Sequence, residues 1–167
     1  MADFASQAVA DLQTLLRFDT TNPPGNEGPA IAWIAERLRE AGIEPTIVSS
    51  NGRPNLVARL LGDGSAGGPL LLAGHVDVVP VDRAKWTHDP FGGEIDAGYL
   101  WGRGAVDMKN MVVQCMTAFL ELKRRGIPLR RDVIFAAVSD EEEGCRHGSR
   151  FLVEQHPDLV RAEYMLG

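Results

Sequence analysis

Apolar side chains recur at helical spacing in three stretches of the chain. The first covers about residues 4–17, with Asp3 placed to cap its start, and the second covers about residues 29–41. The third covers about residues 108–125 and ends at Gly126, with three basic side chains in its last turn, where positive charge complements the helix dipole. The pattern therefore predicts three amphipathic helices.

Short runs of strand character alternate with these helices. The run 133–138 is apolar at every position, which predicts a central strand covered on both faces. The segment 75–98 is rich in turn residues, which predicts a long functional loop or a small hairpin. Other elements expected from the pattern are strands over 44–49, 55–61, 70–73 and 162–166 and a short helix over 149–155. This alternation predicts an α/β layered fold.

The composition indicates a folded domain and excludes some classes of binding partner. Of the 167 residues, 44% are apolar and 24% are charged, which is enough to build a core and excludes a disordered chain. A formal charge of −6 makes nucleic acid a poor partner, and no apolar run approaches the roughly 20 residues of a membrane span. With two cysteines and no signal-peptide pattern, we expect a cytoplasmic protein that does not bind a membrane.

The polar candidates follow the expected strands. His75 and Asp77 come directly after the strand 70–73, and an acidic run, 140–143, comes directly after the strand 133–138. Asp107 follows the run Tyr99-Leu100-Trp101 and opens the third helix. Sites in open α/β sheets form outside the carboxyl ends of the strands, so we expect the three groups to meet at one opening.

One histidine with several carboxylates suits zinc, manganese or cobalt. Asp77 can accept the second imidazole N–H of His75 and so orient the ring. Two cations about 3.5–4 Å apart need an anion between them, and Asp107 is the candidate bridge. Of Glu141 and Glu142, one can bind metal while the other serves as the base for a metal-activated water, and spacing alone does not decide which.

Taken one at a time, these motifs have other interpretations. An Asp-Glu-Glu-Glu run is more often a solvated acidic turn than a metal site. The run Gly102-Arg103-Gly104-Ala105-Val106-Asp107 imitates a dinucleotide-binding fingerprint, but Asp107 stands where the third glycine must allow close helix packing.

Four blocks of the chain, taken together, resemble the co-catalytic zinc exopeptidases and amidohydrolases. That family includes aminoacylase, acetylornithine deacetylase, succinyl-diaminopimelate desuccinylase and glutamate carboxypeptidase. The blocks are Leu72-Ala73-Gly74-His75-Val76-Asp77-Val78-Val79-Pro80, Trp86 to Phe91, Gly102-Arg103-Gly104-Ala105-Val106-Asp107-Met108-Lys109 and Ser139-Asp140-Glu141-Glu142-Glu143-Gly144.

The resemblance implies a three-layer α/β/α sandwich with a mixed, mostly parallel sheet, and a site with two zinc ions, for which cobalt or manganese can substitute. In it His75 binds one zinc, Asp107 bridges both, and Glu142 binds the second. The resemblance makes Glu141 the general base. It also counts Asp77 among the catalytic residues, because Asp77 supports His75. The implied reaction is hydrolysis of an amide or peptide bond in a small peptide or N-acyl amino acid.

The family's site needs two further ligands, a carboxylate at the end of the next strand and a histidine near the C-terminus of a longer chain. Neither stands in residues 1–167, and Glu163 lies too early in the strand 162–166. We therefore expect an N-terminal portion of a catalytic domain without its lid domain, through which a homodimer can form in the full-length protein. The alternatives are a single-domain zinc aminopeptidase and a non-catalytic metal-binding or interaction fragment.

Overall fold

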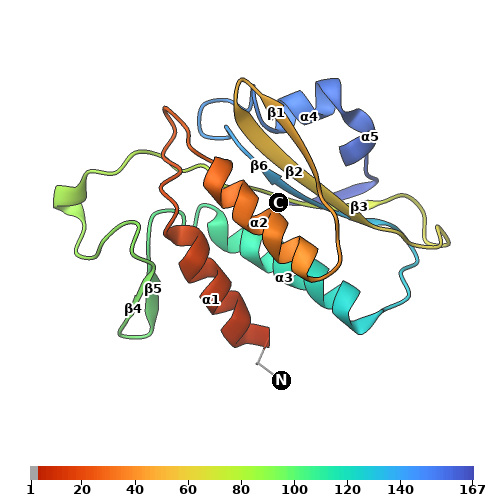
Figure 1. Cartoon of the computed structure of the whole chain (residues 1–167), viewed down its shortest axis with the longest axis horizontal. Helices are drawn as coiled ribbons and strands as arrows, with labels where there is room; N and C mark the ends of the chain where they lie inside the picture. The colour runs from red at the N-terminus through yellow and green to blue at the C-terminus, as the bar shows by residue number, and fades with distance from the viewer. Residues whose placement is uncertain (1–3) are drawn as a thin grey trace.

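A mixed sheet of five strands forms the centre of the computed structural model, which describes residues 4–167 (Figure 1). The strand order is β1-β2-β6-β3-β7, in which β6, β3 and β7 are parallel and β1 and β2 are antiparallel to their neighbours. The strands are β1 (Thr46–Ser50), β2 (Arg53–Leu60), β3 (Leu70–His75), β6 (Val133–Val138) and β7 (Tyr164–Leu166). The run 133–138 is central and buried at every position, as predicted.

Helices cover both faces of this sheet (Figure 1). On one face lie α1 (Phe4–Leu16), α2 (Gly28–Glu40) and α3 (Lys109–Arg125), and on the other lie α4 (Ser149–Gln155) and α5 (Pro157–Val160). The predicted three-layer α/β/α sandwich is confirmed. The sequence pattern did not predict the single turn of α5, although a proline opens it. Asp3, the expected cap of α1, lies outside the described residues.

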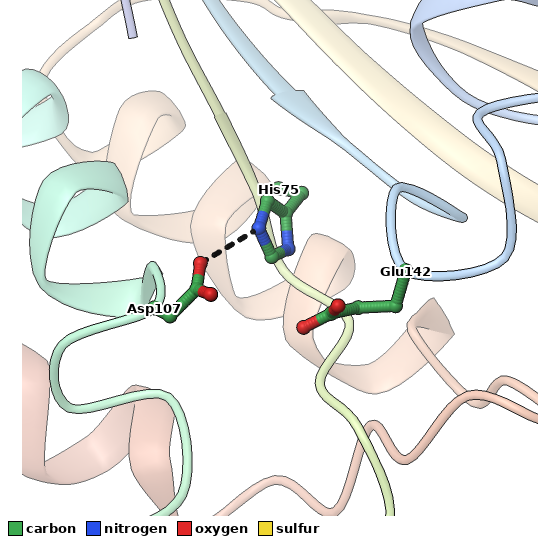
Figure 2. Close-up of side chains that lie close together, drawn as sticks. All are labelled: His75, Asp107 and Glu142. Carbon is green, nitrogen blue, oxygen red and sulfur yellow. Dashed lines mark hydrogen bonds and ion pairs between the residues drawn. The ribbon is translucent and has the colours of Figure 1, made fainter.

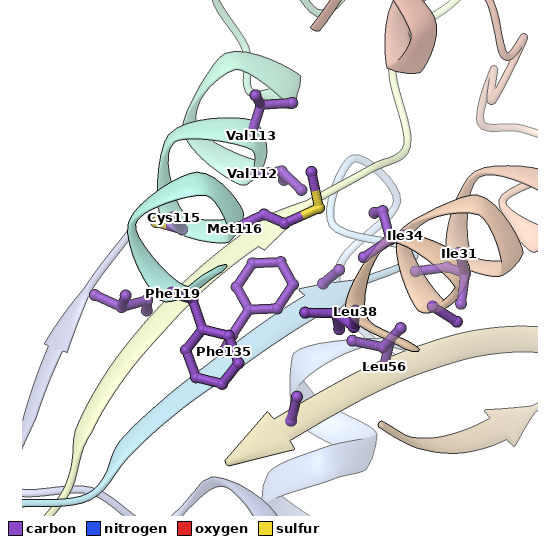
Figure 3. Packing of buried hydrophobic residues seen from close by; sticks show 14 of the residues in the cluster. Ile31, Ile34, Leu38, Leu56, Val112, Val113, Cys115, Met116, Phe119 and Phe135 are labelled. Atoms are coloured by element: carbon purple, nitrogen blue, oxygen red, sulfur yellow. The ribbon is translucent and has the colours of Figure 1, made fainter. Parts of the chain in front are cut away.

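The period-2 alternation of β6 divides its side chains between two cores. On one face, Phe135 packs against α2 and α3 (Figure 3). The centroids of the Phe135 and Phe119 rings are 5.9 Å apart. Ile134, Ala136 and Val138 point the other way and pack with Leu152 of α4. An uninterrupted apolar strand is thus required by burial on both faces, which explains why this run has no polar position.

Between β3 and α3 the chain leaves the sheet. It forms a short 3-10 turn, η1 (Arg83–Lys85), and a separate two-stranded hairpin, β4 (Glu94–Asp96) with β5 (Tyr99–Trp101). The Gln13 side chain of α1 donates a hydrogen bond to the Gly93 carbonyl at 2.8 Å. This bond attaches the segment between β3 and α3 to the helical layer. Within residues 4–167, no helix is both long and apolar enough to cross a membrane.

We predict that Phe135→Ala destabilises the protein by about 3–5 kcal/mol, because the ring is fully buried and its loss leaves a cavity that the sheet and helices cannot close. Phe4→Ala is the matched control, since the Phe4 side chain is about half exposed, and should cost about 0.5 kcal/mol or less. Urea unfolding of both variants measures the difference, and equal losses would contradict the assigned core.

Candidate metal centre

His75 is the last residue of β3, and its side chain is buried. Its Nδ1 lies 3.0 Å from the backbone carbonyl oxygen of Asp77 and 3.5 Å from the Asp77 carboxylate. Nε2 faces the opposite way, 3.2 Å from Asp107 Oδ1 (Figure 2). It also lies 3.7 Å from Glu141 Oε2. With its proton on Nδ1, a neutral His75 directs the Nε2 lone pair at these carboxylates, which is the arrangement of a metal-binding histidine.

Glu141 and Glu142 reach the same place through strand pairing. β3 and β6 are parallel and pair His75 with Val138, so the turn that follows β6 begins beside His75. In this turn the backbone N–H groups of Glu141 and Glu142 each donate to the Asp77 carboxylate at 3.1 Å. The register of two parallel strands therefore brings both glutamates to the same end of the sheet as the histidine, where the sequence analysis expected them to meet.

Asp107 does not follow a strand of the central sheet, contrary to expectation. The run Tyr99-Leu100-Trp101 is β5, which belongs to the separate hairpin and not to the central sheet. The Asp107 side chain is positioned by the turn that leads into α3, where the Asp107–Met108 peptide bond is cis. It is 76% exposed, in contrast to His75 at 4%, so it faces the open side of the cluster.

Donor atoms of His75, Asp107 and Glu142 all lie within 4.8 Å of one another (Figure 2). Atoms bound to one zinc ion at about 2.0–2.2 Å lie at most about 4.4 Å apart, and paired cations lie about 3.5–4 Å apart, so donors this close suit one cation or two that share a ligand. An imidazole with carboxylates is also a donor set that zinc accepts. The residues present thus fit a divalent cation, while their individual roles at it remain predictions.

Asp77 is fully buried, and it does more than the orientation of His75 that the sequence predicted. Burial opposes its ionisation, but hydrogen bonds from His75, Asn22 and the backbone of Glu142 and Glu141 outweigh this and lower the Asp77 pKa. Asp77 therefore stays a carboxylate that joins β3 to the acidic turn. Its contact with Asn22, at 2.8 Å, was not anticipated, because nothing in the sequence marks this loop residue as buried.

The charges around His75 favour a cation. Burial lowers the pKa of His75, but the hydrogen bond and charge of Asp77 and the charge of Glu141 outweigh it and raise the pKa to about 9. Partial burial and the charges of Asp107, Asp77 and Glu141 raise the pKa of Glu142, against the opposing effect of His75. The metal-free cluster thus retains a proton on His75 to offset its carboxylates, and a bound cation can take over that role.

The model of peptidase family M20/M25/M40 matches residues 71–166, which include all five predicted site residues. A curated relative, succinyl-diaminopimelate desuccinylase of Methylorubrum populi, is 41% identical over 161 residues. The match covers 92% of this chain and 40% of the relative, so the chain spans about 40% of the length of the relatives it matches.

Solved structures share the fold. An M20 family metallo-carboxypeptidase from Sulfolobus solfataricus superposes with a TM-score of 0.81 at 20% identity, over 99% of this chain and 37% of that one. A Bacillus subtilis protein, described as a dinuclear metal binding peptidase of the M20 family, gives a TM-score of 0.66 at 19% identity, over 90% of this chain and 39% of that one. Both likenesses support the α/β/α fold.

We predict that metal binding weakens as the pH falls below about 9, because a cation must displace the proton that His75 holds in the metal-free state. The apparent affinity for Co²⁺ should fall about tenfold for each pH unit in this range, as one displaced proton requires. Titrations at pH 7 and pH 8, monitored by visible absorption, measure this slope. An affinity that does not change between the two would exclude His75 as a ligand.

Proposed function

The chain belongs to peptidase family M20/M25/M40, and on this premise we propose that it carries the metal centre of a hydrolase that cleaves an amide or peptide bond. The observation that carries the proposal is the convergence of His75, Asp107 and Glu142 within 4.8 Å, with Glu141 beside them. These residues come from three separate segments, which makes a chance cluster of surface acids a poor explanation. The substrate class we propose is a small peptide or N-acyl amino acid.

We propose that the centre holds two zinc ions, for which cobalt or manganese can substitute. His75 would hold one, Glu142 would hold the other, and the exposed Asp107 carboxylate, which has two oxygens, would be shared by both. When bound, such cations polarise an amide carbonyl and make a water molecule more acidic. Zinc suits the mixed imidazole and carboxylate donors of this chain.

Glu141 is our candidate general base. Its side chain is 49% exposed, and its Oε2 lies 3.7 Å from His75 Nε2, so the carboxylate stands at the cluster but remains accessible to water and substrate. In this role Glu141 accepts a proton from the attacking water and delivers it to the leaving amine. Asp77 acts through its neighbours. It orients His75 and holds the backbone of Glu141, and so fixes the distance between the candidate base, Glu141, and the candidate ligand, His75.

Because the chain spans about 40% of its curated relatives, we propose that it is the N-terminal portion of a longer catalytic domain, and that the remaining ligands come from other segments. A lid domain in the full-length protein would then provide substrate contacts and a homodimer interface. The name of the Methylorubrum populi relative makes an N-succinyl amino acid the first substrate to test. A competing possibility is a chain that binds metal without catalysis.

Glu141→Gln in the full-length protein should reduce kcat for amide hydrolysis by about 10²–10⁴-fold, because the amide keeps the shape of the side chain but cannot accept the proton. Metal content, measured by mass spectrometry, should stay at the wild-type level. The matched control is Glu143→Gln, an exposed glutamate two residues along the same turn, which should leave kcat unchanged. Normal turnover in Glu141→Gln would reject the base assignment.

The bridging role of Asp107 predicts an unequal loss of metal. Asp107→Asn should empty both positions, since one oxygen of the carboxylate serves each cation, whereas Glu142→Gln should empty only one. Metal content per chain after dialysis against a weak chelator distinguishes the two variants. Equal content in both would argue against a bridge, and wild-type content in both would argue against the proposed centre.

A further inference from the structure

Asn22 lies between α1 and α2, and its backbone is attached to the segment that follows β3. Its N–H donates to the Val78 carbonyl at 2.8 Å, and the Val78 N–H donates to the Thr20 carbonyl at 3.1 Å. Thr21 and Val78 form an isolated parallel bridge. These backbone contacts hold Asn22 in place independently of its side chain, and the residue as a whole is only 2% exposed.

The amide of Asn22 lies between two buried carboxylates. Its Nδ2 donates to Asp77 Oδ2 at 2.8 Å and to Asp140 Oδ1 at 3.4 Å, and these aspartates are 0% and 3% exposed. Only the NH₂ end of the amide can face two carboxylates, because the oxygen end would repel both. Asn22 thus places a hydrogen-bond donor between two buried carboxylates that would otherwise face each other.

Asp140 is held in turn by Arg53. Arg53 Nη1 donates to Asp140 Oδ1 at 3.1 Å, and the guanidinium also forms a paired contact with the buried Glu27, with Nε 2.8 Å from Oε2. The other oxygen of Asp140 accepts the N–H of His147 at 2.8 Å. These bonds hold Asp140 at φ 66°, in the left-handed region that side chains disfavour.

The two carboxylates sit at the start of the proposed catalytic turn. Asp140 precedes Glu141 in the chain, and Asp77 accepts the N–H groups of Glu141 and Glu142. A shift of either aspartate therefore moves the backbone that carries both glutamates. Asn22 is the one side chain with hydrogen bonds to both aspartates among residues 4–167.

We propose that Asn22 is a positioning residue for the metal centre: by joining Asp77 to the Arg53-anchored Asp140, it sets where Glu141 and Glu142 stand relative to His75. This inference rests on the proposed function, because it assigns Asn22 a part in metal binding at that same site. Asn22 itself touches neither metal nor substrate in this role and acts through the two aspartates.

The test uses Asn22→Asp and Asn22→Ala in the full-length protein. The first keeps the shape but replaces the donor with a third carboxylate, and the second removes the donor without adding charge. We expect Co²⁺ affinity to fall about 10–100-fold in both, the usual effect of removing a residue that supports metal ligands, with altered absorption bands. In hydrolysis, kcat should fall more than KM rises, since no substrate contact is lost.

A metal-free readout separates positioning from general damage. Amide hydrogen exchange at Glu141 and Glu142 should accelerate in both Asn22 variants, because their acceptor, Asp77, is no longer held, while exchange in β6 stays slow. The matched control is Asn26→Asp. It makes the same change in charge at an exposed asparagine of the same loop, whose side chain donates only to the Asp19 carbonyl at 3.4 Å, and it should behave as wild type.

The outcomes distinguish this inference from the function on which it rests. Wild-type Co²⁺ affinity and exchange rates in either folded variant overturn the positioning role alone. Unfolding of both variants, seen by circular dichroism, assigns Asn22 to general stability and overturns it too. If the wild-type protein binds no Co²⁺, the proposed function fails first, and slow exchange at Glu141 and Glu142 in every variant would then remove the positioning role as well.

Discussion

The buried carboxylate of Asp77 is the constraint on which the candidate centre depends. It is fully shielded from water, yet its pKa is lowered, because its hydrogen bonds come from His75, from Asn22 and from two backbone N–H groups of the acidic turn. A buried charge is tolerated only when it is paired and hydrogen-bonded in this way. One side chain thereby connects β3, the loop after α1 and the turn after β6, and none of the three can move without a cost in free energy.

This connection explains how residues far apart in the sequence meet with the right chemistry. The parallel pairing of β3 with β6 brings His75 beside the acidic turn, and Asp77 fixes the turn's backbone at that place. Asp107 adds a carboxylate to the same cluster from the turn that leads into α3. His75 and Asp77 are thus buried and held by hydrogen bonds, whereas the carboxylates of Asp107 and Glu141 remain accessible. A site for a cation and a substrate requires both a fixed support and accessible ligands.

Much of the fold could be predicted from the chain. The helices α1, α2 and α3 follow from apolar periodicity, because each buries one stripe of its surface. The strand β6 follows from an uninterrupted apolar run, because both of its faces are buried. The turn α5 was missed, since four residues are too few to show a period. The run 99–101 was expected to lead into the site as a strand, but it pairs only with β4, because pairing partners are a tertiary property.

The sequence by itself determined which residue types were available for chemistry and their order along the chain. His75, Asp107 and the run 140–143 each stand next to a strand or helix that can be recognised from its own apolar residues. Only the tertiary structure decided that Asp77 holds the backbone of Glu141 and Glu142, and that Asn22, Asp140 and Arg53 stand behind it. The physical reason is burial. A polar residue in a loop looks the same in the sequence whether water or another side chain will satisfy its hydrogen bonds, and only packing across long chain separations selects between them.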